Sequence, residues 1–316
     1  MSFKVVVLNA AKMDYDGSLD FTGLSDEVVV YADSTPEEIA GRAQGADAIV
    51  TKELVLTEEL VRALPGTVKL ICEAGTGYNN IAIGVCRKLG ITVCNVPAYS
   101  SERVAHTAIM MILCLSSSVP RQVRMLERRD RRNFSEHLLV AHTEVNGKTL
   151  GVIGAGNIGR TVIRVARALG MDVLVHTRTP REEEEGVAYT DLDTVLRQSD
   201  YLSLHCPLTD ETRHIIDRDA LAKMKETAFL INTSRGALVD EDALIEALGQ
   251  GRIAGAGLDV QETEPPADDN PLYDMENVLL TPHMGWKGFE TRQRLVSVIE
   301  DNIRAFRARQ PQNVVS

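Results

Sequence analysis

Short apolar segments alternate with amphipathic stretches along most of the chain. A first series of strand-length segments covers residues 4–8, 27–31, 47–50, 68–73 and 91–96. A second series covers residues 149–154, 172–176, 201–205, 228–232, 253–260 and 277–281. Near-continuous apolar strands that alternate with helical patterns are typical of parallel sheets covered by helices. We therefore predict an α/β protein with two doubly wound parallel-sheet domains.

Several of the intervening helices have recognisable ends. Thr35 precedes a proline and stands three residues before Glu38, which is the pattern of a capping box. Further helices are predicted over 157–169 and 240–248, and an amphipathic helix over 288–309. The segment 100–118 is apolar on most of its faces, which indicates a helix buried between domains or subunits.

Composition narrows the classes of function. The 316 residues include 34 Lys and Arg against 45 Asp and Glu, a net charge of -11. This acidity argues against a nucleic-acid partner, because such binding rests on a basic surface. No apolar run approaches the roughly 20 residues that cross a bilayer, and the N-terminus resembles a first strand rather than a signal peptide. Five scattered cysteines form no CxxC pair, which favours reduced thiols and a cytoplasmic protein.

Two charged runs, the arginine-rich 121–132 and four glutamates at 182–185, are typical of solvated surface. The arginines have a second interpretation, in which they pair with an acidic surface of a partner subunit.

A glycine motif opens the second series of strands. Gly154, Gly156 and Gly159 form GxGxxG between a predicted strand and a predicted helix. The first glycine permits the tight turn, the second a close approach to a pyrophosphate, and the third the packing of helix on strand. The pyrophosphate is expected at the helix N-terminus, beside Asn157 and Ile158, where backbone N–H groups favour an anion. The motif predicts a dinucleotide site.

The end of the next strand bears on which dinucleotide binds. NAD sites usually place an acidic residue there to bind the ribose 2′-hydroxyl. This chain has Thr177, Arg178, Thr179 and Arg181 after His176, and no acid. Arginine suits a 2′-phosphate, so NADP is favoured over NAD. In the alternative, Arg178 stacks on the adenine and the cofactor is NAD.

Four further charged or titratable residues follow strands of the second series. Arg235 follows one strand, Asp259 and Glu264 the next, and His283 the last. The carboxyl ends of parallel strands share one edge of a sheet, which is where ligands bind in open α/β folds. Each residue alone has an ordinary surface explanation. Together, beside a dinucleotide site, they indicate a reaction.

The motifs GTGYNNI, NVPAYS, GVIGAGNIG, HCPLTDET, INTSRG, LDVQETEPP and TPHMGW together resemble the D-isomer-specific 2-hydroxyacid dehydrogenase family. The tail TPHMGWKGFETRQRL resembles its glycerate dehydrogenase/hydroxypyruvate reductase branch. The resemblance implies that Arg235 clamps the substrate, that His283 is the acid/base and that Glu264 is its partner.

The chemistry of these side chains agrees with the implied roles. Reduction of a 2-oxo acid adds a hydride to carbon and a proton to oxygen, and a protonated His283 can supply the proton. A neighbouring carboxylate favours the imidazolium. Arg235 can hold the substrate carboxylate and polarise the carbonyl group.

The resemblance also implies a domain plan. A flavodoxin-like substrate domain is expected from residues 1–98 and 287–316, and a Rossmann cofactor domain from 99–286, with a cleft between them. The helix over 100–118 and the arginine-rich arm are expected to build a homodimer.

Further site residues are implied by the same resemblance. In the substrate domain, a glycine-punctuated turn offers an anion nest of backbone N–H groups, and the expected substrate contacts are Thr76, Gly77, Tyr78, Tyr99 and Trp286. Tyr99 and Trp286 also have an ordinary packing explanation. The remaining cofactor contacts are expected at His205, Cys206, Pro207, Thr212, Thr233, Ser234, Asp259 and Gly285. No metal site is predicted.

One departure from the family pattern concerns His106. Relatives carry a glutamate before this histidine and this chain does not, so we interpret His106 as a structural or interface residue.

The favoured substrates are hydroxypyruvate and glyoxylate. Pyruvate, as in D-lactate dehydrogenases, phenylpyruvate and branched oxo acids are alternatives. A nicotinamide-sensing corepressor of the same fold is the alternative from another class. Turnover of any 2-oxo acid distinguishes an enzyme from such a sensor.

Overall fold

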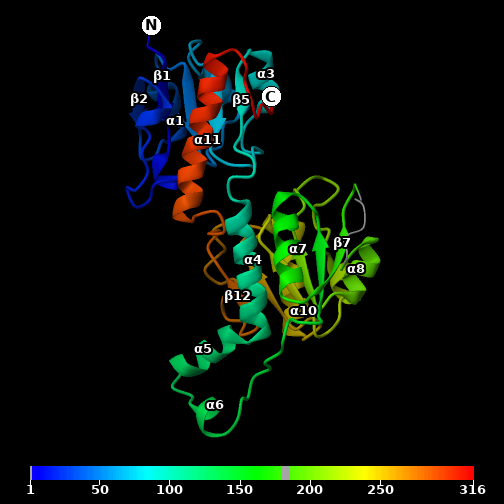
Figure 1. The fold of residues 1–316 in the computed structure, drawn as a ribbon. Coiled ribbons are helices and arrows are strands. Elements are labelled where there is room, and N and C mark those ends of the chain that lie inside the picture. Colours follow the sequence, from blue (N-terminus) through cyan, green and yellow to red (C-terminus); the bar gives the residue numbers. More distant parts are fainter. Residues whose placement is uncertain (1, 180–185) are drawn as a thin grey trace. The chain divides into compact units, whose positions relative to one another are not determined.

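The computed structural model describes residues 2–179 and 186–316, which divide into two compact units (Figure 1). The first unit joins Met1–Ser100 to Lys287–Ser316, and the second is Ser101–Trp286. Each unit is built on a parallel sheet, as the alternating pattern predicted.

The first unit has the strand order β2-β1-β3-β4-β5, with every pair parallel. This is the flavodoxin-like order, and it confirms the predicted fold of this part of the chain. Its elements are β1 (Lys4–Val7), η1 (Ala10–Lys12), η2 (Thr22–Leu24), β2 (Glu27–Val30), α1 (Pro36–Arg42), β3 (Ala48–Thr51), α2 (Glu58–Ala63), β4 (Leu70–Glu73), α3 (Ile83–Lys88), β5 (Thr92–Cys94) and α11 (Phe289–Arg307).

Local sequence explains how this unit is closed. The capping box at Thr35 forms as predicted, and the Glu38 carboxylate accepts the Thr35 N–H at 2.9 Å. The edge strand β5 is covered by the C-terminal segment, in which the Val315 N–H donates to Val93 O at 2.9 Å. Covering an edge in this way satisfies backbone groups that would otherwise offer a template for pairing with another chain.

The second unit has the order β12-β11-β10-β9-β6-β7-β8, again all parallel. Read from the other edge, its first six strands follow the Rossmann order 3-2-1-4-5-6. Its elements are α4 (Ser101–Ser116), α5 (Val119–Glu127), α6 (Arg132–Ser135), β6 (Thr149–Ile153), α7 (Asn157–Ala168), β7 (Asp172–His176), β8 (Val187–Tyr189), α8 (Leu192–Gln198), β9 (Tyr201–Leu204), α9 (Arg218–Lys223), β10 (Phe229–Asn232), η3 (Gly236–Leu238), α10 (Glu241–Gly249), β11 (Gly255–Leu258), η4 (Pro271–Tyr273) and β12 (Val278–Leu280).

Apolar residues fill both faces of the second sheet. Residues of α4 and α7 pack on one face, and residues of α8, α9 and α10 on the other (Figure 1). Helix α4 approaches β11 closely, because a Cβ on Gly257 would lie only 2.9 Å from the Met111 Cβ. The absence of a side chain at Gly257 therefore lets the long apolar helix lie on the sheet.

The structure differs from the sequence-based expectations in several elements. For example, the strand expected over 91–96 is only Thr92–Cys94. The helix expected over 100–118 ends at Ser116, and α5 begins at Val119 after Ser118, whose φ is 50°. The strand expected over 253–260 is shorter, at Gly255–Leu258. Strand β8 was not anticipated, because its three residues do not belong to a longer apolar run, unlike the equally short β5 and β12. In the described part of the chain, no single helix has the length and apolar character of a membrane span. Helices α4 and α5 meet these criteria only when taken together, and they are bent by 65° at the break between them.

Candidate active site

The glycine motif forms the predicted turn between β6 and α7. Gly154 has a φ of +96°, and a Cβ there would lie 2.6 Å from the Cys206 backbone N. A Cβ on Gly159 would lie 2.2 Å from the Gly154 carbonyl oxygen. Both glycines are therefore required by packing within the protein itself.

Gly156 is different, because a Cβ built there meets nothing within 4 Å among the described residues. It is the N-cap of α7, whose first turn carries no acidic residue. Unpaired N–H groups at a helix start form an anion site. The open space at Gly156 and the helix start behind it fit a dinucleotide pyrophosphate.

The end of β7 lies next to this turn, since the Gly154 N–H donates to His176 O at 2.8 Å. Beyond it, Arg178 and Thr179 are exposed and Thr177 is half-buried. No carboxylate is present among these three residues. Arg181 and the glutamates 182–185 lie outside the described residues.

The loops after β9 and β10 are joined at the same edge. Ser234 donates its hydroxyl to Cys206 O at 2.8 Å, and Thr212 donates to Pro207 O at 2.7 Å. Burial raises the pKa of the Cys206 thiol to about 11, so this cysteine stays protonated. Thr233 is buried, and its hydroxyl has no hydrogen-bond partner in the described parts of the chain. A buried hydroxyl group without a hydrogen-bond partner, at the sheet edge where ligands bind, fits a hydrogen bond to a bound ligand.

His205 is held in its neutral form at this edge. Its Nε2 lies 2.8 Å from the Ser203 hydroxyl, and burial lowers the pKa of its ring to about 4. A neutral ring adds no charge to the predicted cofactor region.

The segments that carry Arg235 and Glu264 are in direct backbone contact. A Cβ on Gly236 would lie 1.8 Å from the Gln261 carbonyl oxygen, so only glycine permits this approach. The Arg235 side chain is exposed, and its Nη1 donates to Ser234 O at 2.7 Å. A single glycine thus brings the loops after β10 and β11 together.

His283 and Glu264 form the pair that the sequence predicted. The His283 Nδ1 lies 2.7 Å from the Glu264 Oε2, and the second carboxylate oxygen accepts the Gln261 N–H at 3.1 Å. His283 has a φ of 48°, in the left-handed region. The contact to Nδ1 orients the ring so that Nε2 is the nitrogen available to a substrate.

Asp259 builds the turn that presents His283. Its backbone O accepts the His283 N–H at 2.9 Å, and its carboxylate accepts from the hydroxyl of Thr281 and the N–H groups of Met284 and Gly285. Asp259 is buried, and a Cβ on Gly285 would lie 2.8 Å from its carboxylate. The structure gives Asp259 a positioning role that the sequence analysis did not anticipate.

In the first unit, hydrogen bonds from side chains fix the loop that is predicted to form an anion nest. Thr76 donates its hydroxyl to Val96 O at 3.0 Å, and Asn95 donates its side-chain amide to Thr76 O at 2.8 Å. Within the described residues, the N–H groups of Thr76, Gly77 and Tyr78 donate no hydrogen bond. Backbone donors left over in a fixed loop are what an anion nest requires.

The remaining predicted residues are placed as follows. Tyr99 is buried, and its carbonyl accepts from the Arg294 Nε at 3.1 Å within the first unit. Trp286 is buried at the end of the second unit. His106 is exposed on α4, away from the His283 turn in sequence and on another element.

A family model settles the relationship that the motifs indicated. Residues 109–285 match the model described as D-isomer specific 2-hydroxyacid dehydrogenase, NAD binding domain. The chain belongs to the D-isomer-specific 2-hydroxyacid dehydrogenase family. It is therefore an oxidoreductase that uses a nicotinamide cofactor and interconverts 2-oxo and 2-hydroxy acids.

Relatives of known name extend over almost the whole chain. A hydroxypyruvate reductase of Blautia hydrogenotrophica is 36% identical, covering 99% of this chain and 99% of its own. A glycerate dehydrogenase of Methylorubrum extorquens is 38% identical, covering 89% of each chain. The crystal structure of a glyoxylate reductase from Paecilomyes thermophila aligns with a TM-score of 0.85 at 30% identity, covering 99% of this chain and 98% of that one. Within this fold, the loops that carry Arg235, Glu264, His283 and the glycine turn all belong to the sheet of the second unit.

Proposed function

We propose that this 2-hydroxyacid dehydrogenase reduces hydroxypyruvate or glyoxylate, with Arg235, Glu264 and His283 as its catalytic residues. The observation that carries the proposal is the 2.7 Å contact between His283 and Glu264, on the sheet edge that also holds the glycine turn. The names of the relatives support the two substrates.

His283 supplies the proton of the reaction. A nicotinamide cofactor, when bound, would supply the hydride for reduction or accept it in oxidation. In reduction, the imidazolium gives the proton on Nε2 to the carbonyl oxygen, and in oxidation the neutral ring takes it from the hydroxyl. Glu264 fixes the ring through Nδ1 and stabilises the positive charge it carries before transfer.

Arg235 supplies orientation and charge. Its guanidinium lies on the loop that Gly236 packs against the Glu264 segment. A planar, permanently charged group can bind a carboxylate in two places. Holding the substrate carboxylate there presents the neighbouring carbonyl group to His283.

A loop of the first unit is proposed to contribute backbone donors to the substrate carboxylate. The N–H groups of Thr76, Gly77 and Tyr78 are the donors, and Tyr99 and Trp286 are assigned to the wall of the substrate site. Residues 1–98 and 287–316 then serve as substrate domain, and 99–286 as cofactor domain.

NADP is proposed as the preferred cofactor. The support is the run Thr177, Arg178 and Thr179 at the end of β7, which holds an exposed arginine and no acid. Contacts to the rest of the cofactor are assigned to the glycine turn and to His205, Cys206, Pro207, Thr212, Thr233, Ser234, Asp259 and Gly285.

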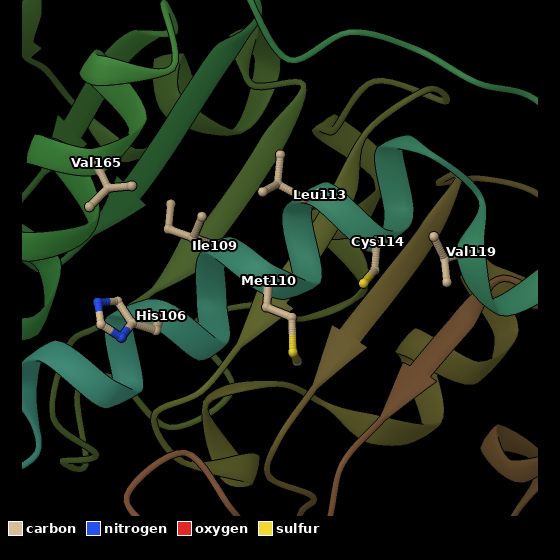
Figure 2. Close-up of a pocket in the computed structure, with 7 residues that line it drawn as sticks. All are labelled: His106, Ile109, Met110, Leu113, Cys114, Val119 and Val165. Atoms are coloured by element: carbon tan, nitrogen blue, oxygen red, sulfur yellow. The ribbon is translucent and has the colours of Figure 1, made fainter. Parts of the chain in front are cut away.

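A homodimer is proposed through α4 and the arm that follows it. His106, Ile109, Met110, Leu113, Cys114, Val119 and Val165 line a groove of about 500 Å³ on the second unit (Figure 2). Helices α5 and α6 bury none of their residues, and Leu126 and Phe134 are 48% and 79% exposed. Exposed apolar side chains and an apolar groove on neighbouring elements support an interaction site, and a second copy of the chain is the occupant we assign.

The arginines of the arm have partners within the same unit. Arg124 donates to the carbonyl oxygens of Tyr273 and Asp274, both at 3.0 Å, and Arg128 forms an ion pair with Glu276 at 2.6 Å. These two arginines therefore anchor the arm to their own unit, in place of the pairing with a partner's acidic surface that the sequence left open. The free state of the five cysteines supports a cytoplasmic location, which we propose for this protein.

The test is a steady-state assay of a panel of 2-oxo acids with NADPH and NADH in parallel. We expect hydroxypyruvate or glyoxylate to give the highest kcat/KM, with NADPH preferred. Faster turnover of pyruvate or of a branched oxo acid would overturn the substrate assignment. Tight cofactor binding without turnover of any 2-oxo acid would favour a nicotinamide sensor.

A further inference from the structure

A buried lysine lies beside the loop that is proposed to bind the substrate carboxylate. Lys52 directly follows β3 and is only 3% exposed. A Cβ built on Gly75 would lie 3.3 Å from the Lys52 Nζ, so the ammonium group is in contact with the first residues of the loop 75–78. Lysine is almost never fully buried unless its charge has a partner.

The backbone of Lys52 is held by Asn9 at the end of β1. The Asn9 amide donates to Lys52 O at 2.6 Å, and its oxygen accepts the Lys52 N–H at 2.9 Å. Asn9 is itself buried. This reciprocal pair fixes the origin of the lysine side chain at the carboxyl edge of the first sheet, where ligands of open α/β folds bind.

Glu73 hydrogen-bonds both to the residues on either side of Lys52 and to the loop that contains Asn80. Its buried carboxylate accepts from the Thr51 hydroxyl at 3.0 Å, the Glu53 N–H at 2.9 Å and the Asn80 amide at 3.0 Å. Burial is the main cause that raises its pKa. Glu73 thus ties the end of β3 to the loop. Its carboxylate also borders Gly75 and is subject to the positive charge of Lys52, which acts to lower its pKa against the effect of burial.

Glu53 is the acid that contacts the ammonium directly. Its Oε1 lies 2.6 Å from the Lys52 Nζ, and the Glu53 side chain is 49% exposed while that of Lys52 is 4% exposed. An ammonium group can donate three hydrogen bonds, so this ion pair does not prevent a contact to a bound anion. The carboxylate is therefore the solvent-facing member of this ion pair.

We propose that Lys52 is a substrate-binding residue, whose ammonium group supplies the positive charge of the carboxylate site formed by the loop 75–78. The proposal rests on the function proposed above, in which this loop binds the carboxylate of a 2-oxo acid. Backbone N–H groups carry only partial charges, and a lysine held beside them adds a full one. Glu53, which pairs with the ammonium group at 2.6 Å, then competes with the substrate for it.

The competition separates this role from a structural ion pair. If Lys52 serves only as a structural partner of Glu53 and Glu73, Lys52→Met changes the free energy of unfolding while the affinity of the folded protein for an anion stays that of wild type. If Lys52 binds the substrate, Lys52→Met weakens anion binding, while Glu53→Gln removes a competitor and leaves it equal or tighter.

The experiment measures the Kd of oxalate, a two-carboxylate mimic of a 2-oxo acid, on protein saturated with NADPH, together with KM and kcat for hydroxypyruvate. We expect Lys52→Met to raise the oxalate Kd and the KM by about tenfold to a hundredfold, as for loss of a charged hydrogen bond. The kcat should change much less, and Lys52→Arg should recover part of the loss. Lys88→Met, an exposed lysine of α3 in the same unit, is the matched control and should match wild type.

Several results would overturn the proposal. These are an unchanged oxalate Kd in Lys52→Met, an equal loss in Lys52→Met and Glu53→Gln, and no oxalate binding by the wild-type protein. Should Lys52→Met fail to fold, Lys52→Gln replaces it. Failure of the proposed function has a different result, namely no turnover of any 2-oxo acid by the wild-type protein, whatever the oxalate Kd.

Discussion

The carboxylate of Asp259 holds the turn that carries His283. It accepts hydrogen bonds from the Thr281 hydroxyl at 2.5 Å, the Met284 N–H at 2.9 Å and the Gly285 N–H at 2.8 Å. These three donors lie on both sides of His283, whose backbone is in the left-handed region. A buried acid therefore maintains an uncommon backbone conformation at the proposed proton donor, as occurs where strain serves function.

We predict that Asp259→Asn destabilises the protein and slows turnover. An amide NH₂ group cannot accept from the backbone N–H groups, so at least one buried donor loses its partner, at a cost of about 1–3 kcal/mol. Chemical denaturation gives the free energy of unfolding, and steady-state assays give kcat. Asp268→Asn, an exposed position in the same unit, is the control. Equal stability and kcat in the two variants would refute the positioning role.

Arg178 is the residue on which the cofactor prediction depends. Arg178→Ala removes this charge and should weaken the binding of NADPH more than that of NADH, because only NADPH carries the 2′-phosphate. The measurement is the Kd of each cofactor by fluorescence titration. An equal loss for both cofactors would instead support stacking of Arg178 on the adenine.

His205 predicts a pH dependence of stability. Its folded-state pKa is lowered from 6.5 to about 4 by burial, so the unfolded chain binds the proton first as the pH falls. The contribution of the neutral ring to the free energy of unfolding is complete above pH 6.5 and is lost as the pH falls towards 4. Thermal unfolding of wild type should therefore show a steeper loss of stability over this window than that of His205→Gln. Parallel curves for the two proteins would contradict the assignment.

The proposed dimer predicts that one charge on the arm changes the mass in solution. The chain has a mass of 34.7 kDa, and we expect wild type to elute at about twice this value in light-scattering chromatography. Phe134→Asp on α6 should shift the mass towards the monomer, since it places a charge in the apolar surface. Val55→Asp, at a 60% exposed position in the first unit, is the control and should remain dimeric. A monomeric wild-type protein would reject the proposal.

Much of the fold could be predicted from local sequence. Parallel strands that are buried on both faces are apolar throughout, and those of both series were placed with errors of only a few residues. The glycine turn and the pair of His283 and Glu264 could be predicted because strand ends in a parallel sheet meet at one edge. Strand β8 and the break at Ser118 could not be predicted. The three residues of β8 lie outside any longer apolar run, and a single left-handed residue leaves little periodic signal.

The contacts that depend on tertiary structure were beyond the sequence. Nothing in the spacing indicates that Gly236 must pass within contact of Gln261, or that the Asp259 carboxylate turns back onto residues 281–285. Lys52 is another example, since a lysine after a strand is usually solvated, whereas this one is buried and its backbone is held by Asn9, which is distant in sequence. The one signal in the sequence for Lys52 was its position as a charged residue in an otherwise apolar region.

The central claim is that His283 transfers the proton of a 2-oxo acid reduction. The most direct measurement compares hydroxypyruvate turnover by wild type and His283→Gln, with the Kd of NADPH determined for both proteins. We expect turnover to fall by roughly 10²–10⁴, the usual contribution of a general acid, while the Kd stays within about twofold of wild type, since the ring lies outside the cofactor contacts assigned above. Turnover equal to wild type, with the cofactor bound normally, would contradict the account.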